Sequence, residues 1–283
     1  MKSQNLLLTL IVGILTLSIV GGVGLVGVAG MEDNTTVNVT ASGEGLWIFP
    51  GPRKLDPEVF GTPDQPKMLE ALPLEERKVS EDGESFTTTK NPGPFSNKVA
   101  PSEGELSLTI WDRTELDSMN SQDEAELEAT FEDPSGKNSY RVVLQKLIPV
   151  GPHHQFFGGA ATNVYMHGST GVGEPLMPAT WSYVTLWGFG DFYRNGEKLD
   201  DRRLIHVMLT PRMRSEDNEL GFGIANMEEL EIHFIMPPTR VEHGHPETKP
   251  LPTKLELPNG KEQPFIHFNF YGNIQVEENK YLN

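Results

Sequence analysis

From residue 103 onward, apolar side chains tend to recur at every second position of the chain. Leu106, Leu108 and Ile110, for example, alternate with polar residues. Successive side chains of a β-strand point to opposite faces, so this period of two predicts strands with one buried face. Further strands are expected at residues 127–131, 140–144, 181–187, 204–210, 230–236 and 265–271. Asn195-Gly196 is typical of a two-residue hairpin turn.

These strands determine the expected fold class. No stretch after residue 30 has the apolar period of about 3.6 residues that marks an amphipathic helix. Short strands separated by Gly- and Pro-rich turns predict an all-β domain, either an antiparallel sandwich or a sheet closed on itself. We favour an antiparallel β-sandwich over residues 103–283, preceded by an N-terminal apolar helix and a Pro-rich acidic segment.

The N-terminal segment predicts where the protein is located. Residues 6–29 form an uncharged, mostly apolar run that follows Lys2 and precedes Glu32 and Asp33. This charge order is typical of an export signal. Residues 1–30 are therefore expected to be a cleaved signal peptide or a retained transmembrane anchor, and N-terminal sequencing of the mature protein distinguishes the two. Both interpretations place the remaining chain outside the cytoplasm, as a secreted, periplasmic or membrane-anchored protein.

Charge and composition restrict the partners. The chain has a formal net charge of -17 and no cysteine. An acidic surface repels the phosphate backbone, which argues against nucleic-acid binding, and a chain without cysteine has no disulfides or thiolate metal sites. Residues 31–102, rich in proline and acidic residues, are expected to form an extended segment. The partners left open are a membrane (through an uncleaved N-terminal helix), a metal ion and a cell-surface ligand.

Histidines supply the candidate metal ligands. His206, His233 and His267 each stand between two apolar residues of a predicted strand, so their side chains are expected on the face opposite the apolar one. If two of these strands pair in register, facing side chains lie about 5 Å apart, and two imidazoles can then hold one ion. With His167, they are the predicted metal site. Imidazole suits copper or zinc, and Met208, on the face of His206, favours copper.

An aromatic run predicts a different class of function. Trp181, Tyr183 and Trp187 share one face of a predicted strand, and Val184 and Leu186 share the other. The aromatic face could stack sugar rings, as in a carbohydrate-binding or cell-surface adhesion module. It could equally be the domain interior, where large aromatic side chains bury the most area. We favour the interior for this face.

A metal-dependent enzyme is the third hypothesis. Such an enzyme needs an open coordination position and a general base, and only Glu242 and Glu174 are nominal candidates for that base. No catalytic motif accompanies them. The sequence therefore predicts a binding protein rather than one that turns over a substrate.

Overall fold

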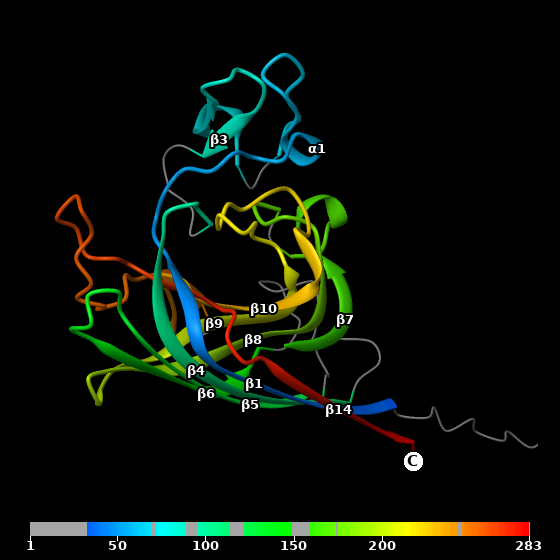
Figure 1. Ribbon diagram of the computed structural model, residues 1–283, viewed down its shortest axis with the longest axis vertical. Helices are drawn as coiled ribbons and strands as arrows, with labels where there is room; N and C mark the ends of the chain where they lie inside the picture. Colours follow the sequence, from blue (N-terminus) through cyan, green and yellow to red (C-terminus); the bar gives the residue numbers. More distant parts are fainter. Residues whose placement is uncertain are drawn as a thin grey trace, which may run out of the picture. The chain divides into compact units, whose positions relative to one another are not determined.

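A closed ring of antiparallel strands forms the main part of the protein. The computed structural model describes residues 33–69, 72–88, 95–113, 122–148, 159–173, 175–242 and 245–282. The ring closes because β8 pairs with β9 as well as with β6. In spatial order its strands are β8 (Thr180–Arg194), β9 (Glu197–Arg212), β10 (Asn226–Met236), β13 (Ile266–Phe270), β1 (Asp33–Ile48), β4 (Val99–Asp112), β5 (Glu124–Glu132) and β6 (Ser139–Leu147). Figure 1 shows β1, β4, β5 and β6 along one side and β8, β9 and β10 along the other.

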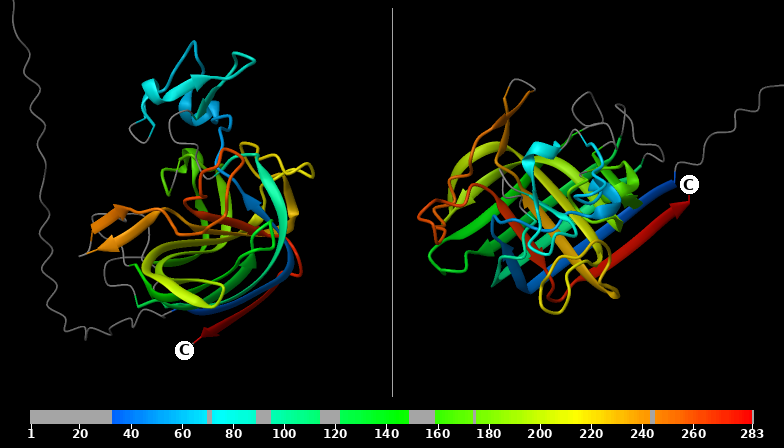
Figure 2. Two further views of the ribbon diagram at one scale, coloured as in Figure 1. Left: turned by 90° about the vertical axis from the view of Figure 1, so that its left-hand side faces the viewer. Right: turned by 90° about the horizontal axis from the view of Figure 1, so that it is seen from above.

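Further strands extend this sheet. β7 (Ala160–Met166) pairs with β8, and β14 (Gln275–Leu282) pairs with β1, beside which it runs in Figure 2. The hairpin of β11 (Thr239–Glu242) and β12 (His245–Thr248) joins β9. The smaller elements are α1 (Pro57–Phe60), η1 (Leu74–Glu76), β2 (Arg77–Val79), β3 (Phe86–Thr88) and η2 (Gly168–Thr170).

The predicted all-β, antiparallel architecture is confirmed. Each strand expected after residue 103 is present, and Asn195 and Gly196 have the positive φ angles, 52° and 82°, that their hairpin turn requires. The pairing shows one sheet that closes on itself. The two layers of the expected sandwich therefore correspond to opposite walls of a single continuous sheet.

The N-terminal part of the ring differs from the sequence-based division of the chain. β1 lies between β4 on one edge and β13 and β14 on the other, and Val37, Val39 and Ala41 point into the core. The expected boundary at residue 102 falls inside β4. Residues 31–102 therefore include a strand of the main sheet. β1 alternates apolar with polar side chains, and its apolar side chains belong to the core. Between β1 and β4, a small apolar cluster forms around Leu55, Phe60, Leu72 and Phe86.

The predicted N-terminal helix, residues 1–30, lies outside the described residues. Among the residues that the structure does describe, no helix has the length and the apolar content that crossing a membrane requires.

Aromatic side chains fill the centre of the ring. The Trp47 ring of β1 contacts those of Phe131, Tyr140 and Phe268, with centroid distances of 5.7, 5.5 and 6.1 Å. Phe131 also packs against Phe234 from the opposite wall. All these side chains are buried. The ring interior is thus a packed hydrophobic core that joins both walls.

Replacing a central ring should destabilise the whole domain. We expect Phe131→Ala to lower the free energy of unfolding by about 3–5 kcal/mol, because Phe131 is only 2% exposed and its removal leaves a cavity. Urea denaturation measures the change. Phe222, 42% exposed, provides the matched control, and Phe222→Ala should change stability by less than about 0.5 kcal/mol. Equal effects of the two substitutions would contradict this account of the core.

Asp133 holds the turn between β5 and β6. Its carboxylate accepts hydrogen bonds from the Ser135 backbone N–H (2.9 Å), the Ser135 hydroxyl (2.5 Å) and the Asn138 amide (2.6 Å). Burial alone raises the pKa of Asp133, but these hydrogen bonds to the charged form outweigh that effect. The pKa of Asp133 therefore lies below its ordinary value, and the ionised form stabilises the fold.

Asp133→Asn should lower stability in a pH-dependent way. Because the folded-state pKa lies below the unfolded value of about 3.9, the carboxylate's contribution is present above that pH and is lost as the pH falls through the folded pKa. We expect a loss of roughly 1–3 kcal/mol at pH 7, shrinking below pH 4, in urea titrations at each pH. The exposed Asp64→Asn is the control. A loss that is independent of pH would refute this role.

Candidate metal centre

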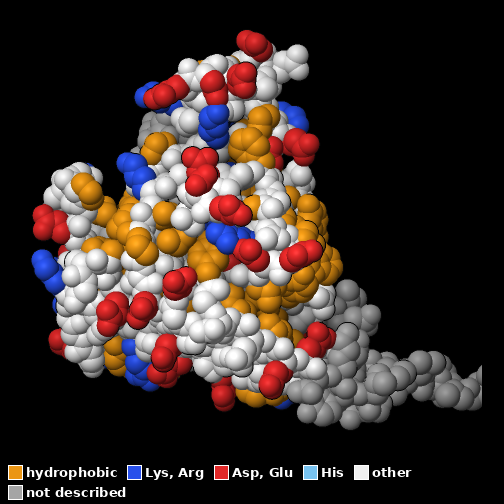
Figure 3. Space-filling model, viewed as in Figure 1, with side chains coloured by type: hydrophobic (Ala, Val, Ile, Leu, Met, Phe, Trp, Pro, Cys, Tyr) orange, Lys and Arg blue, Asp and Glu red, His pale blue; other side chains and the backbone are white. Residues whose placement is uncertain are grey.

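Three of the four candidate histidines lie on the outer wall of the ring. His206 (β9), His233 (β10) and His267 (β13) alternate with core residues such as Val207 and Phe234, so they point away from the interior. The side chains of the three histidines are nevertheless buried, at 2%, 1% and 1% exposure. The outer face of β5 is different, because its glutamates lie in solvent. Acidic side chains are spread over the molecular face shown in Figure 3.

Other segments of the chain cover the histidine wall. The Phe95 ring meets the His267 ring edge-on at 5.4 Å, and the Arg214 guanidinium donates a hydrogen bond to the Ser96 carbonyl at 3.0 Å. Apolar side chains complete this cover and pack against Ile235 of the wall, namely Phe95, Met177, Met213 and Leu220. The wall is therefore an internal layer between the ring and its cover rather than an open surface.

The strand register does not place any two of the strand histidines opposite each other. Met208 of β9 and Asn269 of β13 are the direct neighbours of His233, while Ile235 lies between His206 and His267. The expected facing pair of imidazoles is therefore absent from β9, β10 and β13. Instead, the structure groups the four predicted ligands into two pairs.

His167 and His206 form the first pair, and Met208 joins it. The two ring centroids are 5.9 Å apart, and His167 Nε2 lies 3.0 Å from Met208 Sδ. His206 Nδ1 donates a hydrogen bond to the Leu186 carbonyl at 2.8 Å, which leaves the lone pair of this tautomer on Nε2. The Trp187 indole stacks on the His206 ring at 4.1 Å. Two imidazoles and a thioether thus share one buried, partly aromatic environment.

A glycine-rich loop positions His167. The residue follows β7 with a φ of 68°, and its backbone N–H donates to the Val172 carbonyl at 2.6 Å, so the loop folds back on itself. Gly173 packs directly against the imidazole. A Cβ atom on Gly173 would lie 2.9 Å from both Cε1 and Nδ1 of His167. The close packing leaves Nε2 as the nitrogen directed toward Met208.

His233 and His267 form the second pair, with ring centroids 5.9 Å apart. His233 Nε2 donates a short hydrogen bond to the Glu231 carboxylate, and the two groups form an ion pair when His233 is protonated. Burial raises the pKa of Glu231, but the charge and hydrogen bond of His233, together with a hydrogen bond from Tyr271, outweigh burial and hold that pKa below its ordinary value. Glu231 was not among the predicted residues, although it precedes His233 by two positions and so shares its face.

The two pairs do not merge into one four-histidine site. Among the residues that the structure describes, no three His, Cys, Asp or Glu side chains lie close enough together to hold a metal ion. Those four residue types do not include methionine, whose thioether is also a metal ligand. The soft ligand set of His167, His206 and Met208 is therefore the strongest candidate centre.

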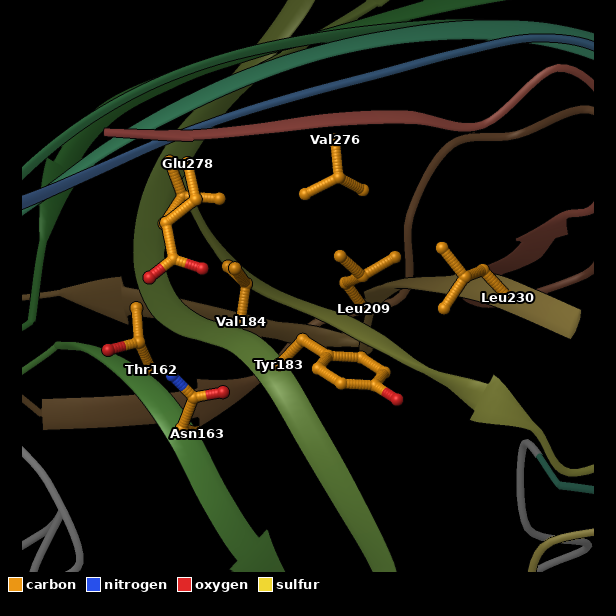
Figure 4. A pocket seen from close by; sticks show the side chains of 9 residues that line it. Thr162, Asn163, Tyr183, Val184, Leu209, Leu230, Val276 and Glu278 are labelled. Carbon is orange, nitrogen blue, oxygen red and sulfur yellow. The ribbon is translucent and has the colours of Figure 1, made fainter. Parts of the chain in front are cut away.

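Of the aromatic candidates on β8, Trp187 lies on the outer side, stacked on His206, whereas Tyr183 packs against the edge of the ring core. Val184 and Leu186 are in the ring core, so the expectation that the aromatic face forms the interior is wrong. Trp181, Tyr183 and Trp187 are all partly exposed. Tyr183 also borders a hollow of about 210 Å³, shown in Figure 4, which is lined mainly by apolar side chains together with Glu278.

Of the two candidate bases, Glu242 stands apart from the histidine pairs. Glu242 accepts a hydrogen bond from Arg240 Nη1 at 2.5 Å on β11, at the edge of the sheet. Glu174 lies outside the described residues.

Comparisons with protein-family models, with curated proteins and with solved structures gave no match.

An alanine at position 173 should displace the His167 ring, whereas an alanine at position 171 should not. Gly173 and Gly171 have nearly the same φ, 76° and 77°, but a Cβ on Gly171 would meet nothing within 4 Å. Both alanine substitutions should incur the backbone strain of roughly 1–2 kcal/mol, and Gly173→Ala should lose about 1–3 kcal/mol more through contact with the imidazole. Chemical denaturation and the imidazole NMR signals of His167 measure this difference. Indistinguishable variants would contradict the described packing.

Proposed function

We propose that this protein binds copper as Cu(I), through His167 Nε2, His206 Nε2 and Met208 Sδ. The observation that supports this most directly is the 3.0 Å contact between His167 Nε2 and Met208 Sδ in a buried layer. A thioether is a soft ligand that selects Cu(I) over zinc, whereas imidazole accepts either metal. In a chain without cysteine, histidine and methionine are the side chains that can provide such a site.

The geometry of the first pair suits this ion. A metal–nitrogen bond of about 2 Å places the centroid of a bound imidazole roughly 3 Å from the ion. Two rings on one ion then have centroids within about 6 Å of each other, and the rings of His167 and His206 are 5.9 Å apart. The hydrogen bond from His206 Nδ1 to the Leu186 carbonyl is the outer contact that typically orients a metal-binding imidazole. The Trp187 ring shields the same histidine from water.

The N-terminal segment suggests where the protein binds copper. We propose that the apolar residues 6–29 export the chain, either as a signal peptide or as a membrane anchor, and that a flattened, sandwich-like ring displays the site there. The acidic surface would attract cations toward the domain. The partner is then a metal ion, and we propose no nucleic-acid partner.

Carbohydrate or cell-surface binding is the second candidate function. Its support is that Trp181, Tyr183 and Trp187, close together on β8, are all partly exposed. Trp187 has one face stacked on His206, so Trp181 and Tyr183 would contribute most of a sugar platform. Trp181→Ala separates the two proposals, because it should abolish oligosaccharide binding and leave Cu(I) binding unchanged.

Replacing the sulfur ligand is the direct test of copper binding. We expect residues 31–283 to take up one Cu(I) per chain in competition with a colorimetric Cu(I) chelator. Met208→Leu should weaken this affinity by at least about tenfold, the loss that even an indirect change at a metal site causes. The fold should survive, because exchanging Met for Leu usually costs less than about 1.5 kcal/mol.

Met177 is the matched control for this experiment. It is a buried methionine of the cover, 2% exposed, outside the group of Met208. Met177→Leu should leave the Cu(I) affinity unchanged. If Met208→Leu and Met177→Leu bind Cu(I) equally well, or if the parent chain binds none, the contact of His167 with Met208 is a structural hydrogen bond and the proposal fails.

A further inference from the structure

Two buried polar atoms have unused bonding capacity, one on His233 of the second histidine pair and one on its strand neighbour Asn269. Nδ1 of His233 and Oδ1 of Asn269 have no hydrogen-bond partner among the described residues. The side chains of His233 and Asn269 are 1% and 0% exposed. Buried polar atoms are almost always hydrogen-bonded, so two such atoms on neighbouring residues indicate a missing partner.

Strand register makes the two residues that carry these atoms direct neighbours. His233 and Asn269 are direct partners in the antiparallel pair of β10 and β13, and both side chains are on the outer wall. Their Cβ atoms are expected about 5 Å apart. Nδ1 and Oδ1 are each two bonds from their own Cβ, so a single atom between the strands can contact both. His267 lies diagonally across the same strand pair, with its ring 5.9 Å from that of His233.

The bonding of these side chains defines the kind of partner that fits. His233 Nε2 is committed to the Glu231 carboxylate, which leaves Nδ1 as the coordinating nitrogen. Asn269 uses its amide nitrogen to donate to the Tyr271 hydroxyl, at 3.4 Å, so its oxygen can only accept. In the neutral tautomer of His233 that keeps its proton on Nε2, Nδ1 is an acceptor too, and two neighbouring acceptors need an electron-poor atom between them. A carboxylate on the far nitrogen of an imidazole is also the usual second contact of a metal-bound histidine.

We propose that His233 Nδ1, Asn269 Oδ1 and His267 form a second metal site, for a divalent ion of the Zn(II) or Cu(II) type. Nitrogen and amide-oxygen ligands without sulfur favour such an ion over Cu(I). The negative charge of Glu231, which contacts His233, offsets part of the charge of the bound divalent ion. This site shares no ligand with the Cu(I) site, although Met208 is the other strand neighbour of His233. The inference therefore stands independently of the proposed copper binding.

Asn269→Leu tests the second site with a variant that should fold. Removing an acceptor that has no partner and replacing it with an apolar group of similar size is close to neutral for stability. We expect isothermal titration of residues 31–283 with Zn(II) to lose one tight site, with an affinity at least about tenfold weaker at that site. Asn269→Asp should do the opposite, with lower metal-free stability and a larger rise in melting temperature on adding Zn(II).

The two metal proposals fail separately. Met208→Leu should leave Zn(II) binding unchanged, and Asn269→Leu should leave Cu(I) binding unchanged. If the parent chain and Asn269→Leu take up the same number of Zn(II) ions with the same affinity, the atom between His233 and Asn269 is a water molecule and the second site does not exist. A stability loss in Asn269→Leu without any change in Zn(II) binding leads to the same conclusion.

Discussion

The pairing of β8 with β9 is the constraint on which the rest of the structure depends. It closes the sheet, so that each strand of the ring has one face toward a common interior and one face away from it. Aromatic and aliphatic side chains fill the interior around Trp47 and Phe131. Every polar side chain that alternates with them must then go to the outside. On β9, β10 and β13 this outside is covered by other parts of the same chain, so histidines, a glutamate and an asparagine become buried without entering the hydrophobic core.

Local sequence patterns separate the two faces of a strand well, but they do not by themselves show which face is the interior, as β8 illustrates. The alternation around His206, His233 and His267 is enough to separate them from the core, because side-chain direction within a strand depends only on neighbouring residues. Strand order and register are different, because they arise from contacts between distant parts of the chain. Met208 and Asn269 became the neighbours of His233 through the pairing of β9, β10 and β13, which periodicity within one strand does not specify.

The position of His167 was the least predictable part of the candidate site. It is on a loop, with a positive φ that is uncommon for histidine, and it reaches His206 only because β7 and β9 both pair with β8. Glu231 could have been found from its two-residue spacing to His233. The Pro-rich region between β1 and β4 was not predicted to cover the histidine wall, for a different reason. Its charge and proline content suggest an extended segment, yet Phe95 and Ser96 belong to the cover of the histidine wall.

The place of β1 in the ring affects how the chain can be made and delivered. β1 begins at Asp33, and its partner β13 ends at Phe270, so the seam between them joins two strands from opposite ends of the folded unit. The circle of strands cannot be completed while synthesis is still under way upstream of β13. If the apolar residues 6–29 direct translocation during synthesis as we propose, the polypeptide enters the export machinery before its ring of strands has closed. Closure of the ring, and with it the assembly of both histidine pairs, would then follow translocation.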